Sequence, residues 1–333
     1  MKVLVTGGLG VIGSATVQHY LSMGNQVFVI DAAEEPRNEW VLTRLRSELD
    51  PGRQSDLMVD CARLETYPQL DARVGEADII IHAAAHTGIP HSAIDPSDDW
   101  ASNVEATRQL LESMRRVDAK APTVLMSSVK PYALPLKIPV RGINETVPLE
   151  PDEPYAASKM AQSALGMAYA RSYGLPVTVL RFSNLYGPAP CHGPRHGWLT
   201  WFCIAAAIGR QLEVQGGGNQ VRDMLYSDDV VNALVLAVGK IRTTQGRIFN
   251  VGGGPDNRIT VMEAAGLIAR KTGASIYRGP GRQHEDQMFW TDYREFNRTT
   301  TWRPKVGVHD GIERVLSWAT NNSEALRPLY EGQ

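Results

Sequence analysis

Tyr155 and Lys159 are the two residues whose types and spacing point most directly to chemistry. In a helix, residues four apart lie one turn apart on the same face, so the phenol and the amine would be neighbours. A nearby ammonium favours the phenolate and lowers the pKa of a tyrosine from about 10 toward neutral pH. The pair is therefore a candidate base. The same spacing also occurs in helices that carry a half-buried tyrosine and a solvated lysine, so other parts of the sequence must decide.

A glycine-rich segment near the N-terminus predicts a site for the phosphates of a dinucleotide. The apolar strand expected at 2–6 is followed by Gly7, Gly10 and Gly13, and then by a helical pattern from Ala15 to Met23. Such glycines permit a tight turn, the approach of backbone amides to a pyrophosphate, and close packing of the helix on the strand. A glycine triplet alone is a weak signal, and the next strand must support it.

The second expected strand, at 26–30, ends in Asp31. An acid at about this distance from the glycine-rich turn typically binds the ribose hydroxyls of NAD. The next residues are Ala32 and Ala33, and the first arginine beyond them is Arg37, so the sequence places no cation for the 2′-phosphate of NADP. We therefore expect NAD as the cofactor. The alternative is that Asp31 is only a solvated residue at a strand end.

Polar residues also follow three later strands. Asp60 follows the apolar residues 57–59 and is either an adenine contact or a turn residue. Ser128 ends the apolar strand expected at 122–127, and Asn184 follows the strand expected at 176–181. In an open parallel sheet, ligands bind at the carboxyl ends of the strands. Ser128 is therefore well placed to hydrogen-bond a substrate hydroxyl or carbonyl.

The elements that would position these residues alternate along the chain. Strand patterns lie near 2–6, 26–30, 56–59, 77–82, 122–127 and 176–181, with helical patterns between them. This alternation is typical of a doubly wound parallel sheet of the Rossmann type. After Gly187 the pattern becomes mixed, with helical runs at 199–208, 229–238 and 261–272 and a strand at 247–251. We predict an α/β protein with an NAD-binding Rossmann domain at 1–184 and a smaller mixed α/β substrate domain at 185–333, between which the chain can cross back.

In this order, the segments resemble the extended short-chain dehydrogenase/reductases that act on nucleotide sugars. The resemblance covers nearly the whole chain and rests on Thr6 to Gly13, His82-Ala83-Ala84-Ala85, Asn103, Ser127-Ser128, Tyr155 with Lys159, Arg181 to Pro188, and Gln220 to Asp223 with Asp228-Asp229. It implies an NAD-dependent enzyme in which Ser128, Tyr155 and Lys159 are the catalytic residues.

The resemblance also implies which residues bind the two ligands. The implied cofactor-binding residues are Gly7, Gly10, Val11, Ile12, Gly13, Asp31, Asp60, Cys61, Ala83, Ala84, Asn103, Tyr155 and Lys159. The implied substrate-binding residues are His86, Thr87, Ser128, Lys130, Asn184, Leu199, Arg222 and Arg282. A sugar that must turn over cannot be held tightly, so affinity should come from the nucleotide diphosphate, through Asn184, Arg222 and Arg282. For Arg282 the alternative is a solvated loop charge.

Segments of the C-terminal half are most similar to the CDP-tyvelose (CDP-paratose) 2-epimerases. These segments are 196–203, 218–223 and 302–306, with Asp310-Gly311, and Lys130 matches as well. That group carries Thr-Asn-Lys and a long insertion before the catalytic tyrosine, whereas here Val129 replaces the Asn and the segment before Tyr155 is short. The resemblance implies an epimerase in which Tyr155 deprotonates a sugar hydroxyl, Ser128 orients it, and the ketone formed accepts hydride on its other face.

Other reactions of this family use the same three catalytic residues. A 4,6-dehydratase carries Asp-Glu directly after its catalytic hydroxyl residue, and the corresponding residues here are Val129 and Lys130, which disfavours dehydration. A decarboxylase, a reductase or a dehydrogenase stays open. A non-enzymatic NAD-binding regulatory or scaffold protein is a further alternative. The joint presence of Ser128, Tyr155 and Lys159 disfavours it, because a binding module does not need all three.

Composition agrees with an enzyme of the cytoplasm. The formal net charge of -2 gives no general attraction to nucleic acid or to an anionic membrane. The sequence holds no apolar run of about eighteen residues, and its first strand begins at residue 2, so neither a membrane span nor a signal peptide is expected. Cys61, Cys191 and Cys203 are widely spaced, which argues against disulfides and against zinc. No metal is expected at Cys191, His192 and His196, because prolines mark this segment as a loop.

The expected partners are a nucleotide diphosphate sugar and a second copy of the chain. Helices are expected at about 97–117 and 153–173, and the resemblance implies that these two helices form the interface of a homodimer. The second helix offers four apolar side chains, those of Met160, Leu165, Met167 and Ala168. Not all of them can face the core of the monomer if an apolar face is left for a partner.

Overall fold

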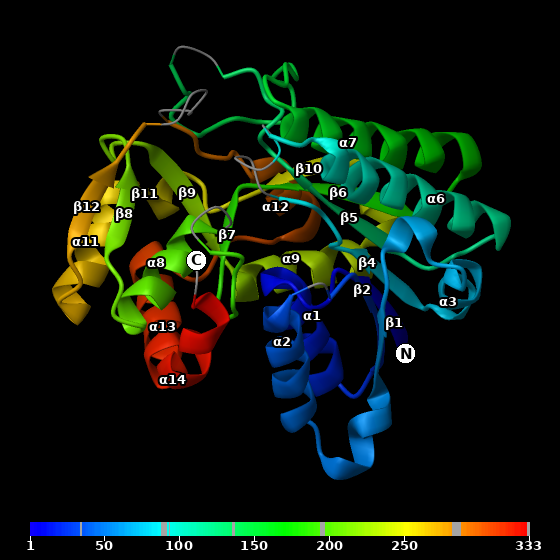
Figure 1. Ribbon diagram of the computed structural model, residues 1–333. Helices are drawn as coiled ribbons and strands as arrows, with labels where there is room; N and C mark the ends of the chain where they lie inside the picture. Colours follow the sequence, from blue (N-terminus) through cyan, green and yellow to red (C-terminus); the bar gives the residue numbers. More distant parts are fainter. Residues whose placement is uncertain are drawn as a thin grey trace.

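The computed structural model describes residues 1–33, 35–87, 92, 94–134, 137–193, 197–281 and 288–331. Its larger part is built on a parallel seven-stranded sheet (Figure 1). The strands are β1 (Lys2–Thr6), β2 (Gln26–Asp31), β3 (Leu57–Cys61), β4 (Ile79–His82), β5 (Thr123–Ser128), β6 (Val177–Phe182) and β10 (Ile248–Val251). Their order is β10-β6-β5-β4-β1-β2-β3, so the chain winds outward from β1 to one edge and then from β4 to the other. The predicted doubly wound α/β sheet is confirmed.

Helices cover both faces of this sheet (Figure 1). On one face lie α1 (Val11–Ser22), α2 (Pro36–Ser47) and α9 (Ser227–Gly239), and on the other lie α3 (Leu70–Glu76), α6 (Ala106–Arg116) and α7 (Pro154–Tyr173). Successive strand residues point to opposite faces. In β1, Val3 and Val5 pack with the first set of helices, and Leu4 packs with the second. Because both faces are buried, these strands are apolar along their whole length rather than alternating with polar residues.

The second half of the chain forms a smaller part with its own core. A three-stranded sheet contains β7 (Asn184–Tyr186), β9 (Val221–Tyr226) and β11 (Arg258–Thr260), and a two-stranded parallel sheet contains β8 (Leu212–Gln215) and β12 (Ile276–Gly279). The helices packed with them are α8 (Trp198–Ala207), α11 (Val261–Thr272), α13 (Val308–Asn321) and α14 (Ser323–Leu326). Helix α11 begins at a capping box formed by Thr260 and Glu263 and ends before Gly273, whose φ of +76° favours glycine.

Short elements complete the fold. They are α5 (Ser97–Asp99), a π-helical segment (Trp100–Glu105), α10 (Ile241–Thr244), α12 (Arg294–Thr300) and the 3₁₀ turns Pro51–Asp56, Leu64–Thr66, Pro255–Asn257 and Arg327–Tyr330. The sequence predicted one helix at about 97–117. In the structure this region begins as α5, continues as the π-helical segment and then becomes α6.

The chain crosses back to the large sheet after it has entered the smaller part. Sequence analysis assigned the strand at 247–251 to the smaller domain, and this assignment is wrong, because β10 pairs with β6 in parallel and Asn250 lies opposite Arg181. Helix α9, which precedes it, packs on α1. The division into 1–184 and 185–333 allowed the chain to cross back between the two domains, and it remains a prediction.

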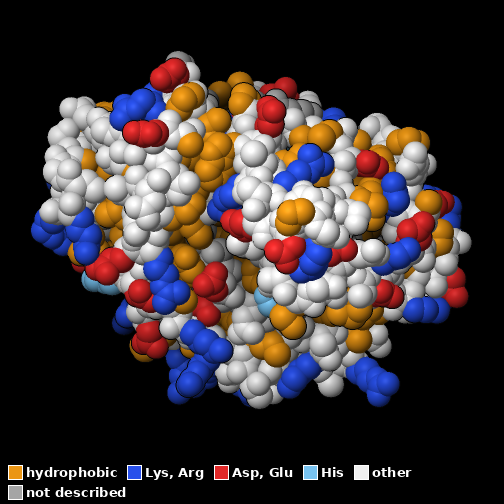
Figure 2. Space-filling view, turned by 90° about the horizontal axis from the view of Figure 1, so that it is seen from below, with side chains coloured by type: hydrophobic (Ala, Val, Ile, Leu, Met, Phe, Trp, Pro, Cys, Tyr) orange, Lys and Arg blue, Asp and Glu red, His pale blue; other side chains and the backbone are white. Residues whose placement is uncertain are grey.

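The surface on the face seen in Figure 2 carries Lys and Arg side chains interspersed with Asp and Glu side chains. This mixture agrees with the formal net charge of -2. Within the ranges described above, every helix is too short or too polar to cross a membrane.

Candidate active site

Helix α7 places Tyr155 and Lys159 on its buried face. The helix begins at Pro154, where a missing backbone N–H breaks no helical hydrogen bond, and ends before Gly174, whose φ of +67° suits glycine. Gly166 lets the helix approach the sheet, since a Cβ there would lie 2.7 Å from Leu125 Cδ1. Tyr155 is 9% exposed and Lys159 is 2% exposed. The predicted helix and the shared face of the pair are both found.

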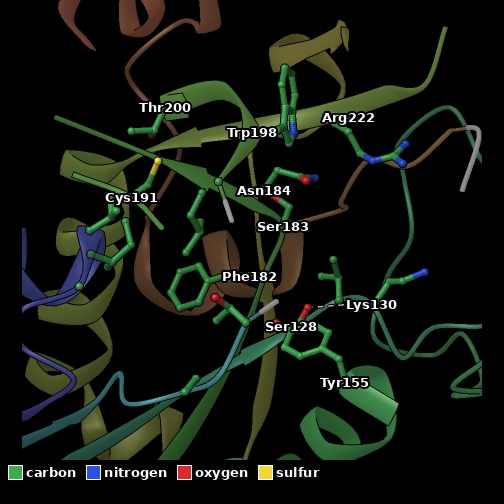
Figure 3. A pocket seen from close by; sticks show the side chains of 18 of the residues that line it. Ser128, Lys130, Tyr155, Phe182, Ser183, Asn184, Cys191, Trp198, Thr200 and Arg222 are labelled. Atoms are coloured by element: carbon green, nitrogen blue, oxygen red, sulfur yellow. Dashed lines mark hydrogen bonds between the residues drawn. The ribbon is translucent and has the colours of Figure 1, made fainter. Parts of the chain in front are cut away.

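Ser128 ends β5 and meets Tyr155 at the floor of a cavity (Figure 3). Both hydroxyl groups line this cavity. Lys159 Nζ donates a hydrogen bond to the backbone oxygen of Met126, at 2.8 Å. Ser128 Oγ also accepts a hydrogen bond from the backbone N–H of Lys130, at 3.1 Å. The strand end and the helix thus bring together the three residues predicted to be catalytic.

Burial decides the protonation of this pair in a way that the sequence did not predict. Desolvation raises the pKa of Tyr155 to about 12, and the hydrogen bond with Ser128 opposes this rise. Desolvation lowers the pKa of Lys159 to about 7, and the charge of Asp99 opposes this fall. The expected lowering of the Tyr155 pKa by Lys159 alone is therefore corrected. A low-dielectric site favours the neutral forms of both groups, so the phenolate needs further positive charge.

The turn between β1 and α1 forms a backbone cradle in which only glycine fits at two positions. A Cβ at Gly7, whose φ is +69°, would lie 2.5 Å from the backbone nitrogen of Ala84. A Cβ at Gly13 would lie 1.9 Å from the backbone oxygen of Gly7. The N-terminus of α1 then opens toward the cavity, with its first amides directed at any bound phosphate. This geometry fits the pyrophosphate of NAD.

Asp31 fixes the cradle against the end of β2. Its carboxylate accepts hydrogen bonds from the backbone N–H of Leu9, at 2.8 Å, and of Ala33, at 3.0 Å. Arg37, the next arginine along the chain, is buried and forms an ion pair with Glu35. The charge of Arg37 is thus matched within the protein, which agrees with a site for NAD rather than NADP.

Three further predicted cofactor residues lie at the end of β3 and on the π-helical segment. Cys61 is exposed and lies opposite Asp31 in the pairing of β2 with β3. Asp60 accepts a hydrogen bond from the Tyr67 hydroxyl and lies 3.8 Å from Arg73 Nη2. The buried Asn103 donates from Nδ2 to Ser158 Oγ, at 2.9 Å. Contacts of Asp60, Cys61 and Asn103 with the cofactor remain predictions.

The cavity itself has a volume of about 500 Å³ and lies between the two parts of the molecule. The predicted residues that line it are Gly7, Gly10, Val11, Ile12, Gly13, Ala83, Thr87, Ser128, Lys130, Tyr155, Lys159, Asn184 and Arg222. The ends of β7 and β9 bring Asn184 and Arg222 close, because Asn184 pairs with Met224. In Figure 3 these two residues lie across the cavity from Ser128 and Tyr155.

Two predicted substrate residues are placed differently, and a third is not described. Leu199 is buried in the core of the smaller part, and its neighbours Trp198 and Thr200 line the cavity instead. The His86 ring is hydrogen-bonded to Asp99 rather than placed on the cavity wall, which Thr87 reaches. Arg282 lies outside the described residues.

Sequence analysis missed several residues that line the cavity, among them Glu153, Trp198, Thr200, Glu213, Gln220 and Phe289. Glu153 is the most informative, because its carboxylate lies 4.0 Å from Lys130 Nζ at the catalytic end. Glu153 could have been predicted from the sequence, because it stands two residues before Tyr155. For Glu213 and Phe289 no local signal exists, because only the fold brings them to the site.

Arg222 and Asp223 have separate functions, because neighbouring strand residues face opposite sides. Arg222 faces the cavity. Asp223 is fully buried and accepts hydrogen bonds from the backbone N–H groups of Gly254 and Thr291, each at 3.1 Å. Burial raises the pKa of Asp223 to about 6. Asp223 therefore joins β9 to two loops, and Arg222 is the residue of this pair that lines the cavity.

Comparison with known proteins adds a decisive observation. The model of the NAD dependent epimerase/dehydratase family matches residues 3–252, a range that contains the glycine cradle, Ser128, Tyr155, Lys159 and Arg222. The chain belongs to this family. NAD is thus its cofactor, and the resemblance drawn from the motifs is confirmed. The glycine cradle at the N-terminus of α1 fits this cofactor, and the contact of Asp31 with its ribose remains a prediction.

Relatives within the epimerase/dehydratase family span more than one reaction. The CDP-paratose 2-epimerase of Salmonella typhi is 26% identical over 345 residues, covering 96% of this chain and 100% of the relative. The dTDP-glucose 4,6-dehydratase of Actinoplanes is 30% identical over 332 residues, covering 97% of this chain and 98% of the relative. A structure of the dTDP-glucose 4,6-dehydratase of Streptomyces venezuelae with NAD bound has a TM-score of 0.87 at 29% identity. The match covers 99% of this chain and 100% of that chain. Family membership alone therefore leaves the reaction open.

Proposed function

We propose that the protein is an NAD-dependent nucleotide-sugar epimerase that acts by transient oxidation of one sugar hydroxyl. The observation that carries the proposal is the pair of residues after Ser128. Val129 is buried in an apolar cluster, and Lys130 lines the cavity with its Nζ 3.8 Å from Asp152 and 4.0 Å from Glu153. The two acidic groups that the family's dehydratases place directly after the catalytic hydroxyl residue are thus replaced by an apolar group and a cation.

The proton transfer is assigned to Tyr155. As a phenolate it removes the proton of the sugar hydroxyl, and Ser128, which lines the same cavity, holds that hydroxyl and stabilises the developing carbonyl. The glycine cradle would hold NAD, which would supply a reversible hydride acceptor and the positive charge of an oxidised ring. Burial raises the pKa of Tyr155 to about 12, so positive charge beside the ring is the influence that makes deprotonation feasible.

Substrate affinity is assigned to the remote end of the cavity. Arg222 and Asn184 lie together across the cavity from the catalytic floor (Figure 3). Arginine and amide groups suit a diphosphate, for which charge-assisted hydrogen bonds are strong. Binding through the diphosphate leaves the sugar able to rotate, as return of hydride to its other face requires.

One observation favours a second candidate, a dehydratase. Glu153 and Lys130 both line the cavity beside Tyr155 and offer an acid and a base, although not in the positions usual for the family's dehydratases. Elimination of water needs such a pair near the sugar ring. This candidate differs from epimerisation in requiring exchange of a carbon-bound proton with solvent.

Incubation in deuterated water with a panel of CDP-, UDP-, GDP- and dTDP-sugars, followed by NMR of the products, separates the two candidates. We expect one sugar to give its epimer, with a CDP-linked deoxyhexose inverted at C2 as the first choice, and no deuterium at C3 or C5. Oxidation and return of hydride at one carbon exchange no other carbon-bound proton. Deuterium at C3 or C5 would instead show enolisation and point to a dehydratase or a 3,5-epimerase.

We also propose that the enzyme acts as a homodimer in the cytoplasm, with α6 and α7 at the interface. Ala164 and Ala168 of α7 are exposed, and Met160 is partly exposed, so a small apolar strip faces outward. Met167, which the sequence analysis included in this face, packs in the monomer core. Light scattering at micromolar concentration should give twice the monomer mass. A monomer would contradict the assignment.

A further inference from the structure

Asp99 is a fully buried acid beside the catalytic residues that the reaction described above does not use. Its side chain is 0% exposed, and Oδ1 lies 2.9 Å from His86 Nδ1. Because a carboxylate only accepts hydrogen bonds, Nδ1 of His86 carries the proton of this contact. The second oxygen, Oδ2, is also buried and has no hydrogen-bond partner in the part of the chain that the structure describes. A buried carboxylate with one unpaired oxygen is costly unless a nearby cation compensates it.

The backbone around Asp99 is built to hold it there. Helix α5 ends at Asp99 and continues as the π-helical segment Trp100–Glu105, a rare geometry that often occurs at functional sites. Asn103, four residues later, accepts the His86 backbone N–H at Oδ1 and donates to the His86 backbone oxygen, each at 3.0 Å. Asn103 also donates to Ser158 Oγ on α7. The loop that carries His86, the π-helical segment and α7 are thus fixed around one buried charge.

Lys159 is the cation whose ionisation the charge of Asp99 influences. Lys159 is buried on α7, and α7 contacts both α5 and the π-helical segment. Burial lowers the pKa of Lys159 to about 7, and the charge of Asp99 acts in the opposite direction. Asp99 also opposes the ionisation of Tyr155, as Glu153 does, and so adds to the rise of its pKa.

Two histidines also face this group of charges. His82 on β4 is fully buried and has its pKa lowered to about 3, first by burial and then by Lys159, so it is neutral near pH 7. His86 donates to Asp99 from the other side. Asp99 therefore lies on segments that pack against α7, and its charge favours the ammonium form of Lys159 within a low-dielectric site.

We infer that Asp99, held in orientation by His86, is the fixed counter-charge of Lys159 and thus a positioning residue for proton transfer at Tyr155. The inference rests on the proposed catalytic functions of Tyr155 and Lys159, but not on which sugar is epimerised. It separates two functions within the buried polar cluster. Asn103 holds the backbone of the loop that carries His86, and Asp99 supplies the negative charge that acts on Lys159.

The variant Asp99→Asn keeps the shape of the side chain and removes its charge. Loss of the negative charge disfavours the ammonium of Lys159 and favours the phenolate of Tyr155, so the pKa of each group falls. An opposite charge within about 4–6 Å shifts a pKa by about 1–3 units, and we expect a fall of about one unit for Lys159. The matched control is Asp98→Asn, because Asp98 lies on the same short helix but is half-exposed and pairs with Arg63.

Two measurements detect the expected fall of these pKa values. NMR titration of protein labelled with ¹³C at lysine Cε gives the pKa of Lys159 directly, without substrate, after assignment of its signal with Lys159→Met. Single-turnover reduction of bound NAD on mixing with the nucleotide sugar gives a pH–rate profile. We expect Asp99→Asn to move both toward acid pH by about one unit, and Asp98→Asn to move neither. A merely structural loss would lower the rate without moving the profile.

An unchanged Lys159 titration in a folded Asp99→Asn variant would overturn the inference. Asp99→Ser, which is smaller and still offers His86 an acceptor, is the second charge-removing variant and should show the same shift. If both fail to fold while Asp99→Glu folds with the normal profile, the charge serves stability and the inference is wrong. Failure of the wild-type protein to reduce its NAD with any sugar would count against the proposed function alone, because the NMR titration needs no turnover.

Discussion

Tyr155→Phe should abolish turnover while leaving the binding of NAD and nucleotide sugar nearly intact. The variant removes only the hydroxyl that transfers the proton, a contribution of about 10²–10⁴ in rate. The ring stays buried on α7 and keeps its packing. We expect less than about one per cent of the wild-type kcat, with KM and the Kd of NAD within about threefold.

The matched control is Tyr169→Phe. Tyr169 lies on the same helix, but its hydroxyl donates to Glu112 on α6, away from the cavity. This control should retain the wild-type kcat, so that loss of a tyrosine hydroxyl from α7 is not by itself the cause of inactivity. If Tyr155→Phe keeps more than a few per cent of the rate, another base acts, and Lys130 on the cavity wall is the first residue to test.

Arg222→Ala should raise KM for the nucleotide sugar by about 10², with kcat less affected. The loss of a charge-assisted hydrogen bond costs about 1.5–3 kcal/mol, which corresponds to a factor of about 10–10². Arg222 lines the cavity from β9, on the side opposite the glycine cradle that is assigned to NAD. The Kd of NAD, measured by fluorescence titration, should therefore stay within about twofold of wild type.

Arg258→Ala is the control for this change. Arg258 lies on β11, next to β9, but is exposed and stacks on Trp290, with its guanidinium carbon 4.5 Å from the ring centroid. Removing this charge should leave KM unchanged. Equal KM values for Arg222→Ala and wild type would show that the diphosphate is bound elsewhere, and an equal loss of NAD affinity would show that Arg222 acts on the fold.

The sequence predicted those features of the site that depend on residues close to one another along the chain. The glycine spacing between Gly7 and Gly13 was readable because a tight turn before a helix excludes side chains locally. The shared face of Tyr155 and Lys159 followed from the period of one helix. The parallel sheet followed from alternating strand and helix patterns, each of which spans only a few residues.

What the sequence left open depends on contacts between distant segments. The sequence did not predict that Asn250 belongs to the large sheet, because the residues of a four-residue strand do not indicate which sheet the strand joins. Only the fold places Asn250 opposite Arg181. The direction of the Tyr155 pKa shift was wrong because spacing shows a nearby amine but not the loss of water around both groups.

The same reason applies to Asp99, which lies 56 and 60 residues before Tyr155 and Lys159 in a stretch without a recognisable motif. Local patterns set which side chains share a turn or a strand end. Burial, and the charges that meet inside the fold, follow from tertiary packing, because desolvation and Coulombic interactions depend on distance in space and not on distance along the chain.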